Sequence, residues 1–203
     1  MTVAVLLYDN AFSGNCYKVR LLLTLLGIEF ERREVSVVEY GERLATLRGL
    51  SPTLNIPAVV LDDGRPLAES NAILWYFAER SRYLSEDPYE RGQVLQWMFF
   101  EQYKHEPGIA VPRFWDAIAP ERFPRPDDLK VRRASGRDAL KVMERHLREH
   151  AYFVGERFTI ADIALYAYTH VAPEAGLDLE PLPAVRAWLG RVAAEPGLIA
   201  IED

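Results

Sequence analysis

Cysteine, long hydrophobic runs and an excess of positive charge are all lacking in this 203-residue sequence. Because Cys16 is the single cysteine, no disulfide can form within the chain, and we expect the cytoplasm as its compartment. The apolar run at residues 21–26 is too short to span a bilayer, so no membrane partner is expected. The 24 lysines and arginines are outnumbered by 30 aspartates and glutamates, which argues against nucleic acid as a partner.

Two local clusters look like binding sites but have simpler interpretations. The basic cluster of Lys130, Arg132 and Arg133 is typical of one solvated helix face. His146 and His150 fit an H-x-x-E-H pattern found in some zinc proteases. That pattern lies in a polar helix without a clear third ligand, whereas catalytic zinc needs three. We therefore expect a solvated helix face here and no metal site.

What the sequence does contain is an ordinary globular composition, with 49% hydrophobic and 27% charged residues. The first 80 residues predict the order βαβ-α-ββα from their periodicity and turn residues. Strands are predicted at residues 3–8, 30–35, 57–61 and 67–68. Helices are predicted at residues 39–48 and 70–79, and another helix between the first two strands is ended by Gly27. Because a helix connects the first two strands, we expect them to be parallel.

The rest of the chain predicts helices only. Asp87 is a candidate N-cap, with Pro88 at the first helical position and Glu90 completing a capping-box pattern. Further helices are predicted at residues 129–150, 159–169 and 185–194. The fold class is therefore an α/β domain followed by an all-α domain. The expected domains are residues 1–80 and 87–203, with residues 81–86 as the linker.

Three short motifs carry candidate chemistry, and the first is Ile56-Pro57. A proline that opens a strand after a loop is a common place for a cis peptide bond. A cis bond would turn the backbone of Ile56 outward, where it could pair with an extended peptide ligand. An ordinary trans proline at a strand start is the alternative.

The second motif is Glu69-Ser70, with Ser70 expected at a helix N-cap. Free backbone N–H groups and the serine hydroxyl suit a carboxylate, and the Glu69 side chain suits an ammonium group. The pair therefore fits the α-amino-acid end of a ligand. A helix cap without a ligand is the alternative.

The third motif is the turn from Ser13 to Cys16, which precedes the first helix. A helix N-terminus favours an anion, so Ser13 or Asn15 could donate a hydrogen bond to a thiolate or phosphate. Cys16 is either a thiol of lowered pKa or a small buried hydrophobic residue.

These motifs together resemble the cytosolic glutathione transferase family, bacterial type, with a serine/asparagine-type turn. The resemblance runs through essentially the whole chain. The matching segments are SGNCYKVR at residues 13–20, NIPAVVLDDG at 55–64, LAESNAILWY at 67–76 and FVGERFTIAD at 153–162.

The resemblance implies a thioredoxin-like first domain, an all-helical second domain, a homodimer and glutathione as co-substrate, with no metal. It implies that Pro57 is cis and that Ile56 pairs with the cysteinyl backbone of glutathione. Glu69 and Ser70 would hold the γ-glutamyl end. Ser13 aligns with the activating serine or threonine, and Asn15 with the asparagine of a disulfide-reducing subgroup.

Other positions follow the family less closely or play a structural part. Asn55 stands where many members have a lysine, and Arg43 is the candidate helix-two ligand. Tyr8 does not match the tyrosine-type activating position and is expected to be packed. Thr159 and Asp162 match a structural capping box in the buried helix.

The second domain should supply a pocket for a small hydrophobic electrophile, because aromatic walls with a few polar groups suit such a site. Trp97 and Phe99 are expected in the core instead. The candidate pocket residues are Phe12, Tyr103, His105, Arg113, Phe114 and Trp115.

Three functions remain open from the sequence. The first is a transferase that conjugates glutathione to electrophiles, a detoxification reaction. The second is a glutathione-dependent disulfide reductase on the same fold. The third is a partner-binding protein without turnover, against which the joint presence of Ser13, Pro57, Glu69 and Ser70 argues.

Overall fold

A computed structural model describes residues 5–122 and 126–203. Its contacts divide the chain into two compact units, one formed by residues up to Ser81 together with 197–203, the other by residues 82–196. The division falls at the segment expected to be the linker. The tail 197–203, expected in the second domain, belongs instead to the first unit.

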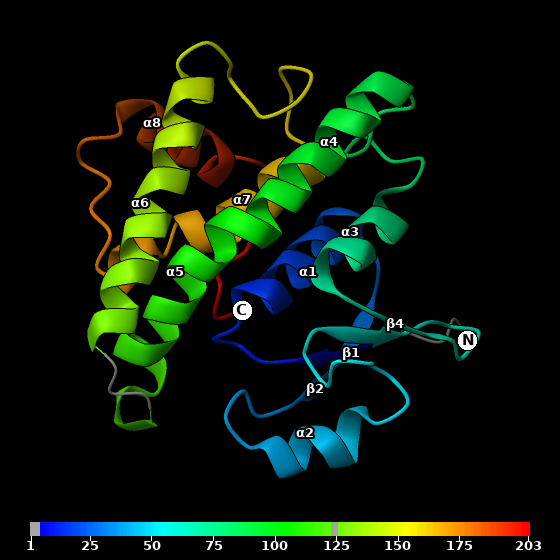
Figure 1. Ribbon diagram of the computed structural model, residues 1–203. Coiled ribbons are helices and arrows are strands. Elements are labelled where there is room, and N and C mark those ends of the chain that lie inside the picture. Colours follow the sequence, from blue (N-terminus) through cyan, green and yellow to red (C-terminus); the bar gives the residue numbers. More distant parts are fainter. Residues whose placement is uncertain (1–4, 123–125) are drawn as a thin grey trace. The chain divides into compact units, whose positions relative to one another are not determined.

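The first unit follows the predicted order of elements, with strand and helix ends shifted by up to two residues (Figure 1). Val3, the expected start of the first strand, lies outside the described residues. The elements are β1 (Val5–Asp9), α1 (Gly14–Leu25), β2 (Phe30–Glu34), α2 (Tyr40–Leu47), β3 (Ala58–Val60), β4 (Pro66–Ala68) and α3 (Ser70–Ala78).

A four-stranded sheet in the order β2-β1-β3-β4 forms the centre of this unit. β1 and β2 are parallel, as predicted, while β3 is antiparallel to both β1 and β4. Alternation along β1 produces two cores, because successive side chains point to opposite faces of the sheet. Leu7 packs with residues of α1 and α3 in one core, and Tyr8 packs with Leu47 of α2 in the other. Figure 1 shows α1 and α3 on one side of the sheet and α2 on the other.

The named elements of the second unit, within its described residues, are all helices; an isolated bridge pairs Val154 with Arg157 in a loop. Its elements are α4 (Pro88–Phe100), the π-helical turn η1 (Glu101–His105), α5 (Glu106–Arg113), the π-helical turn η2 (Phe114–Ile118), the 3-10 turn η3 (Pro120–Arg122), α6 (Pro126–Leu147), α7 (Ile160–Thr169), the 3-10 turn η4 (Ala172–Ala175) and α8 (Pro183–Ala193). The α6 helix ends three residues earlier than predicted. The π turns were not predicted; η1 ends two residues before Pro107, which has no backbone N–H to continue a regular ladder.

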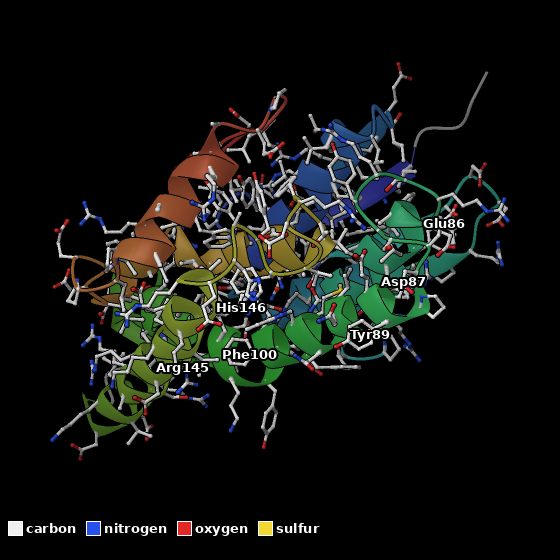
Figure 2. All side chains as sticks on the ribbon, turned by 90° about the horizontal axis from the view of Figure 1, so that it is seen from above. Glu86, Asp87, Tyr89, Phe100, Arg145 and His146 are labelled. Carbon is white, nitrogen blue, oxygen red and sulfur yellow. The ribbon has the colours of Figure 1, made fainter. Side chains whose placement is uncertain are left out.

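The α4 helix begins as the sequence predicts and then departs from it. Figure 2 labels Asp87 at its start and Phe100 at its end. Asp87 caps the backbone N–H groups of Tyr89 and Glu90, and Pro88 occupies the first turn. The Glu90 carboxylate, expected in a capping box, instead pairs with Arg157 at 2.6 Å.

The α7 helix is buried along its whole length and begins with the predicted capping box. Asp162 accepts hydrogen bonds from the backbone and hydroxyl of Thr159, from the backbone N–H of Phe153 and from the indole of Trp188. One carboxylate therefore fixes the start of α7, the preceding loop and α8.

No helix within the described ranges is long and apolar enough to cross a membrane.

Candidate functional site

The turn between β1 and α1 presents Ser13 at the start of a helix. Ser13 is the N-cap of α1, and its Oγ accepts a hydrogen bond from the backbone N–H of Cys16 at 3.3 Å. The hydroxyl hydrogen of Ser13 is not used in that bond, because the oxygen is the acceptor. A half-buried hydroxyl donor therefore sits where the helix dipole favours an anion.

Cys16, on the same turn, has no exposed surface. Burial raises the pKa of its thiol strongly, and the nearby Asp9 carboxylate adds to this effect. The hydrogen bond with Ser13 acts in the opposite direction but is outweighed. Of the two interpretations left open, the small buried hydrophobic residue is confirmed.

Asn15 connects this turn to the start of α3. Its Oδ1 accepts hydrogen bonds from Lys18 Nζ at 2.8 Å and from Ser70 Oγ at 3.2 Å. Lys18 has no exposed surface and also donates to Ser70 Oγ at 3.4 Å. Lys18 was not among the predicted site residues, and its position one helical turn after Asn15 was the available signal.

Glu69 and Ser70 differ from the predicted cap in detail. Glu69, not Ser70, is the N-cap of α3, and its side chain makes no capping hydrogen bond. Glu69 has a φ of +72°, which an L-residue seldom adopts, and its side chain is exposed. Ser70 is buried as the first helical residue. The first turn of α3 thus lacks a side-chain cap from its own N-cap residue, which leaves room for a ligand carboxylate.

The peptide bond between Ile56 and Pro57 is cis, as the resemblance implies. Ile56 lies before the ladder of β3, which begins at Ala58. Its neighbour Asn55 is exposed, and the Asn55 backbone N–H donates to Ser51 Oγ at 3.2 Å.

Arg43 lies in α2, with its guanidinium 5.9 Å from the ring centre of Tyr40. Its Nε is buried and has no hydrogen-bond partner among the described residues.

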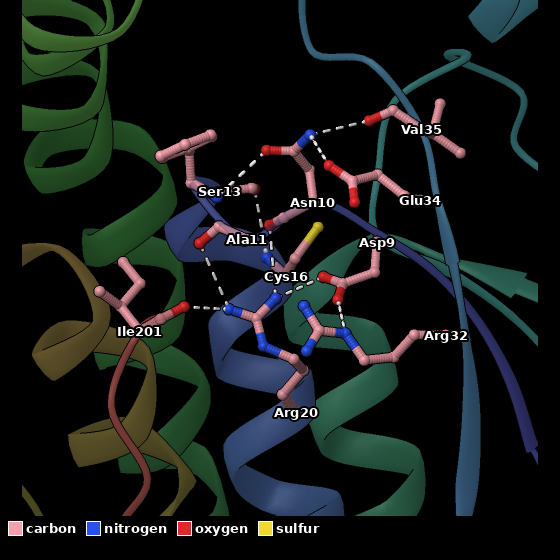
Figure 3. Close-up of polar contacts among 11 residues, drawn as sticks. Asp9, Asn10, Ala11, Ser13, Cys16, Arg20, Arg32, Glu34, Val35 and Ile201 are labelled. Atoms are coloured by element: carbon pink, nitrogen blue, oxygen red, sulfur yellow. Dashed lines mark hydrogen bonds and ion pairs between the residues drawn. The ribbon is translucent and has the colours of Figure 1, made fainter. Parts of the chain in front are cut away.

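A buried ion pair between Arg20 and Asp9 lies next to the turn (Figure 3). Arg20 contacts Asp9 Oδ1 at 2.5 Å, and Arg32 contacts Asp9 Oδ2 at 2.5 Å. The Arg20 guanidinium also donates to the carbonyls of Asn10, Ala11 and Ile201. Tyr8, which precedes Asp9, is packed as expected, with its hydroxyl 3.2 Å from Arg33 Nη1.

The candidate pocket residues of the helical unit do not form one wall. His105 is fully buried, with Nε2 2.8 Å from Thr169 Oγ1, and Arg113 is buried and paired with Glu174 at 2.7 Å. Phe114 and Trp115 are half-buried in η2.

Three aromatic residues of this unit, Trp97, Phe99 and Tyr103, differ in exposure. Tyr103 is 76% exposed and lines an open hollow together with Phe99 and Phe100. Trp97 is buried as predicted, but Phe99 is not in the core. Its side chain is 69% exposed because it lies on the outer face of α4.

Phe12 and the two histidines of the H-x-x-E-H pattern lie apart from these residues in the sequence, and each has its own surroundings. Phe12 is 56% exposed and belongs to the turn of the first unit. His146 packs against Trp97 and Phe153 rather than lying on a solvated face, while the exposed His150 bonds Glu156. Within residues 5–122 and 126–203, no three His, Cys, Asp or Glu side chains converge as metal ligands do.

Comparison with known proteins assigns the family. A family model described as the glutathione S-transferase N-terminal domain matches residues 12–80, and the corresponding C-terminal domain matches residues 109–196. A glutathione S-transferase structure from Pseudomonas fluorescens Pf-5 is 44% identical, with a TM-score of 0.94 over 99% of this chain and 100% of that one. One from Xanthobacter autotrophicus Py2 is 45% identical, with a TM-score of 0.93 over 98% and 97%. Among curated proteins, the disulfide-bond oxidoreductase YfcG of Escherichia coli K12 is 28% identical over 90% of this chain and 87% of its own.

The chain belongs to the glutathione S-transferase family. Its first unit is the thioredoxin-like domain of that fold, and its second unit contains the all-helical domain.

Proposed function

We propose that this protein is a glutathione transferase that activates the glutathione thiol for attack on small hydrophobic electrophiles. The observation that carries the proposal is the half-buried Ser13 hydroxyl at the N-terminus of α1, with its hydrogen not committed to the helix cap. The reaction would take place in the cytoplasm and serve detoxification.

The stabilisation of the thiolate that Ser13 must help to supply is small. A free thiol has a pKa near 8.5, and lowering it to about 6.5 requires roughly 2.7 kcal/mol of preferential stabilisation of the thiolate. A charge-assisted hydrogen bond and a helix N-terminus together supply an amount of this order. The thiolate then forms a carbon–sulfur bond, the leaving group departs with its electron pair, and the thiol proton goes to solvent.

The rest of glutathione is assigned to three other segments of the first unit. The backbone of Ile56, before the cis Pro57, would pair with the cysteinyl residue. Glu69 would take the ammonium group, and Ser70 with the first turn of α3 would take the γ-glutamyl carboxylate. Asn55 and Arg43 are the candidates for the glycyl carboxylate side.

For the electrophile, we propose exposed aromatic side chains as candidate contacts, taken within each unit by itself: Phe12 in the first unit and Tyr103 in the second. Phe114 and Trp115 of the second unit remain candidates, because they are half-buried rather than withdrawn from the surface. His105 and Arg113 are assigned supporting roles, since their polar groups already contact Thr169 and Glu174.

The Ser13→Ala variant tests the proposal. We expect the pKa of bound glutathione, followed by thiolate ultraviolet absorbance, to rise by at least one unit, and kcat/KM toward 1-chloro-2,4-dinitrobenzene to fall about 10- to 100-fold. Ser135→Ala, at an exposed position of α6, is the matched control and should match the wild type. An unchanged thiol pKa in Ser13→Ala would remove Ser13 from this role. Absence of glutathione binding by the wild type would favour the partner-binding alternative.

A second candidate function is glutathione-dependent disulfide reduction, favoured by Asn15 and by the similarity to YfcG. In that reaction a thiolate attacks a disulfide sulfur, and a substrate thiolate leaves. A second glutathione then attacks the mixed disulfide, releasing glutathione disulfide. Comparing turnover of 2-hydroxyethyl disulfide with that of 1-chloro-2,4-dinitrobenzene separates the two functions, because only the former produces glutathione disulfide.

We also propose a homodimer. Leu95, Phe99 and Tyr103 recur every four residues along α4 and η1 and are all exposed, which supports an apolar contact surface. Sedimentation velocity of the wild type and of Phe99→Glu tests this, with dissociation expected for the variant.

A further inference from the structure

Lys18 is a fully buried lysine that contacts both ends of the proposed glutathione site. Its Nζ lies 2.8 Å from Asn15 Oδ1, 3.4 Å from Ser70 Oγ and 3.5 Å from Asn71 Oδ1. Asn15 is on the turn that presents Ser13, whereas Ser70 and Asn71 open α3. A lysine is rarely buried completely unless its ammonium group has partners, and these partners belong to two separate segments.

The chemistry of the ammonium group fixes the orientation of Asn15. A lysine ammonium has three N–H donors and no acceptor, so it must face the amide oxygen of Asn15 rather than the amide nitrogen. The amide NH2 group is consequently turned away from Lys18. Asn15 can donate a hydrogen bond to an anion only in this orientation, because the opposite one would present its oxygen.

Ser70 shares the same acceptor. Its hydroxyl donates to Asn15 Oδ1 at 3.2 Å while Lys18 donates to the hydroxyl oxygen. A ligand carboxylate at the start of α3 would take the Ser70 hydrogen away from Asn15. Lys18 would still hold Asn15 Oδ1, so the amide would keep its orientation when the ligand binds.

We propose that Lys18 is a positioning residue that connects the thiol end and the γ-glutamyl end of bound glutathione. It orients Asn15 so that the amide NH2 serves the thiolate, and it holds Ser70 where the γ-glutamyl carboxylate binds. This inference rests on the proposed function, since it assigns a further residue to the same site.

The first experiment compares Lys18→Met and Lys18→Arg in the full chain. For Lys18→Met we expect KM for glutathione to rise about 10-fold and the pKa of the bound thiol to rise, because Asn15 and Ser70 both lose the hydrogen bond that Lys18 donates. Lys18→Arg should bring both the KM for glutathione and the thiol pKa part of the way back to the wild-type values, since arginine keeps a cationic donor. Lys141→Met, which removes an exposed lysine paired with Asp138 in the helical unit, is the charge-matched control.

A double-mutant cycle tests whether Lys18 acts through Asn15. In the Asn15→Ala background, Lys18→Met should leave the thiol pKa where Asn15→Ala already puts it, while still raising KM through Ser70. A full additional pKa change in that background would overturn the role assigned to Lys18.

Asn15→Asp provides a test that does not depend on how well Lys18→Met folds. The aspartate keeps an oxygen for Lys18 but has no NH2 group, so we expect a higher thiol pKa with little change in glutathione affinity. An unchanged thiol pKa in Asn15→Asp would overturn the inference, as would a folded Lys18→Met with wild-type KM and thiol pKa. Failure of the wild type to bind glutathione would instead overturn the proposed function.

Discussion

Residues of the turn between β1 and α1 differ in how much water reaches them. Ser13 is half-buried, with its hydroxyl at a helix N-terminus, whereas Cys16 three residues later has no exposed surface. The same helix end that favours a thiolate cannot offset burial beside the Asp9 carboxylate. The pKa of the Cys16 thiol is therefore raised, and this cysteine is not available as a nucleophile.

Replacement of Cys16 by alanine tests this conclusion. We expect kcat/KM with glutathione to stay within about twofold of the wild type, since only a buried side chain is shortened, and stability to fall by about 1 kcal/mol. In the wild type, iodoacetamide should label Cys16 only after denaturation. Loss of glutathione turnover in a stably folded Cys16→Ala variant would contradict the prediction.

Glu69 combines an uncommon backbone conformation with an exposed carboxylate. A φ of +72° in a residue with a Cβ is disfavoured by about 1–2 kcal/mol, a strain that glycine does not have. We expect Glu69→Gly to be more stable than Glu69→Ala by about 1 kcal/mol, measured by urea unfolding. Both variants should weaken glutathione binding equally in calorimetry, because both lack the carboxylate. Equal stability of the two variants would show that the backbone is not strained at this position.

At the scale of elements, α5 and α6 approach each other through two glycines. A Cβ on Gly136 would lie 2.5 Å from the carbonyl oxygen of Gly108 and 2.9 Å from Leu177 Cδ1. The carbonyl belongs to the backbone of α5 and cannot rotate away as a side chain would. The close approach of these two helices therefore depends on the absence of side chains at both positions.

Gly136→Ala should destabilise the protein by about 2 kcal/mol, because the added methyl group forces the helices apart. Gly92→Ala is the matched control, since it lies in helix α4 with open space around its Cα. That substitution should stabilise by about 0.5–1 kcal/mol through helix propensity. Thermal unfolding of both variants measures these changes in stability, and an equal change in the two variants would contradict the packing explanation.

The elements themselves were largely predictable because local signals specify them. Asp87 caps its helix as expected, and Thr159 with Asp162 forms the expected box. Where prediction failed, a distant partner competed with the local signal. Arg157 attracts the Glu90 carboxylate away from its own helix N-terminus, and such a pairing is not visible in local sequence.

At the scale of the whole molecule, the last residues of the chain return to the first unit and contact it near the site. Arg20 bonds Asp9 in β1, two carbonyls of the following loop and the carbonyl of Ile201 (Figure 3). Tyr17 adds a hydrogen bond from its hydroxyl to the carbonyl of Ile199 at 2.8 Å. The tail thereby fixes the guanidinium that supports the turn leading to Ser13.

Removal of residues 201–203 should lower the free energy of unfolding by about 2 kcal/mol, because Arg20 loses a charge-assisted hydrogen bond and buried Ile201 is lost. Arg20→Met should cost more, about 3–5 kcal/mol, since it also breaks a buried ion pair. Removal of Asp203 alone is the control and keeps the Ile201 carbonyl. Urea unfolding of the three variants measures these differences, and a deletion of 201–203 as stable as the control would refute the role of the tail.

Sequence alone determined the order of the elements, the parallel pairing of the first two strands, and the motifs at Ser13, Ile56-Pro57 and Glu69-Ser70. These depend on periodicity, caps and turn residues, which act over a few positions of the chain.

Only the tertiary structure decided which residues share a site and which are withdrawn from it. It buried Cys16, His105 and Arg113, and placed Lys18 against both Asn15 and Ser70, which are 55 positions apart in the sequence. It also brought the tail to Arg20. Burial and long-range hydrogen bonds depend on how elements pack in three dimensions, and local sequence patterns carry no record of that packing.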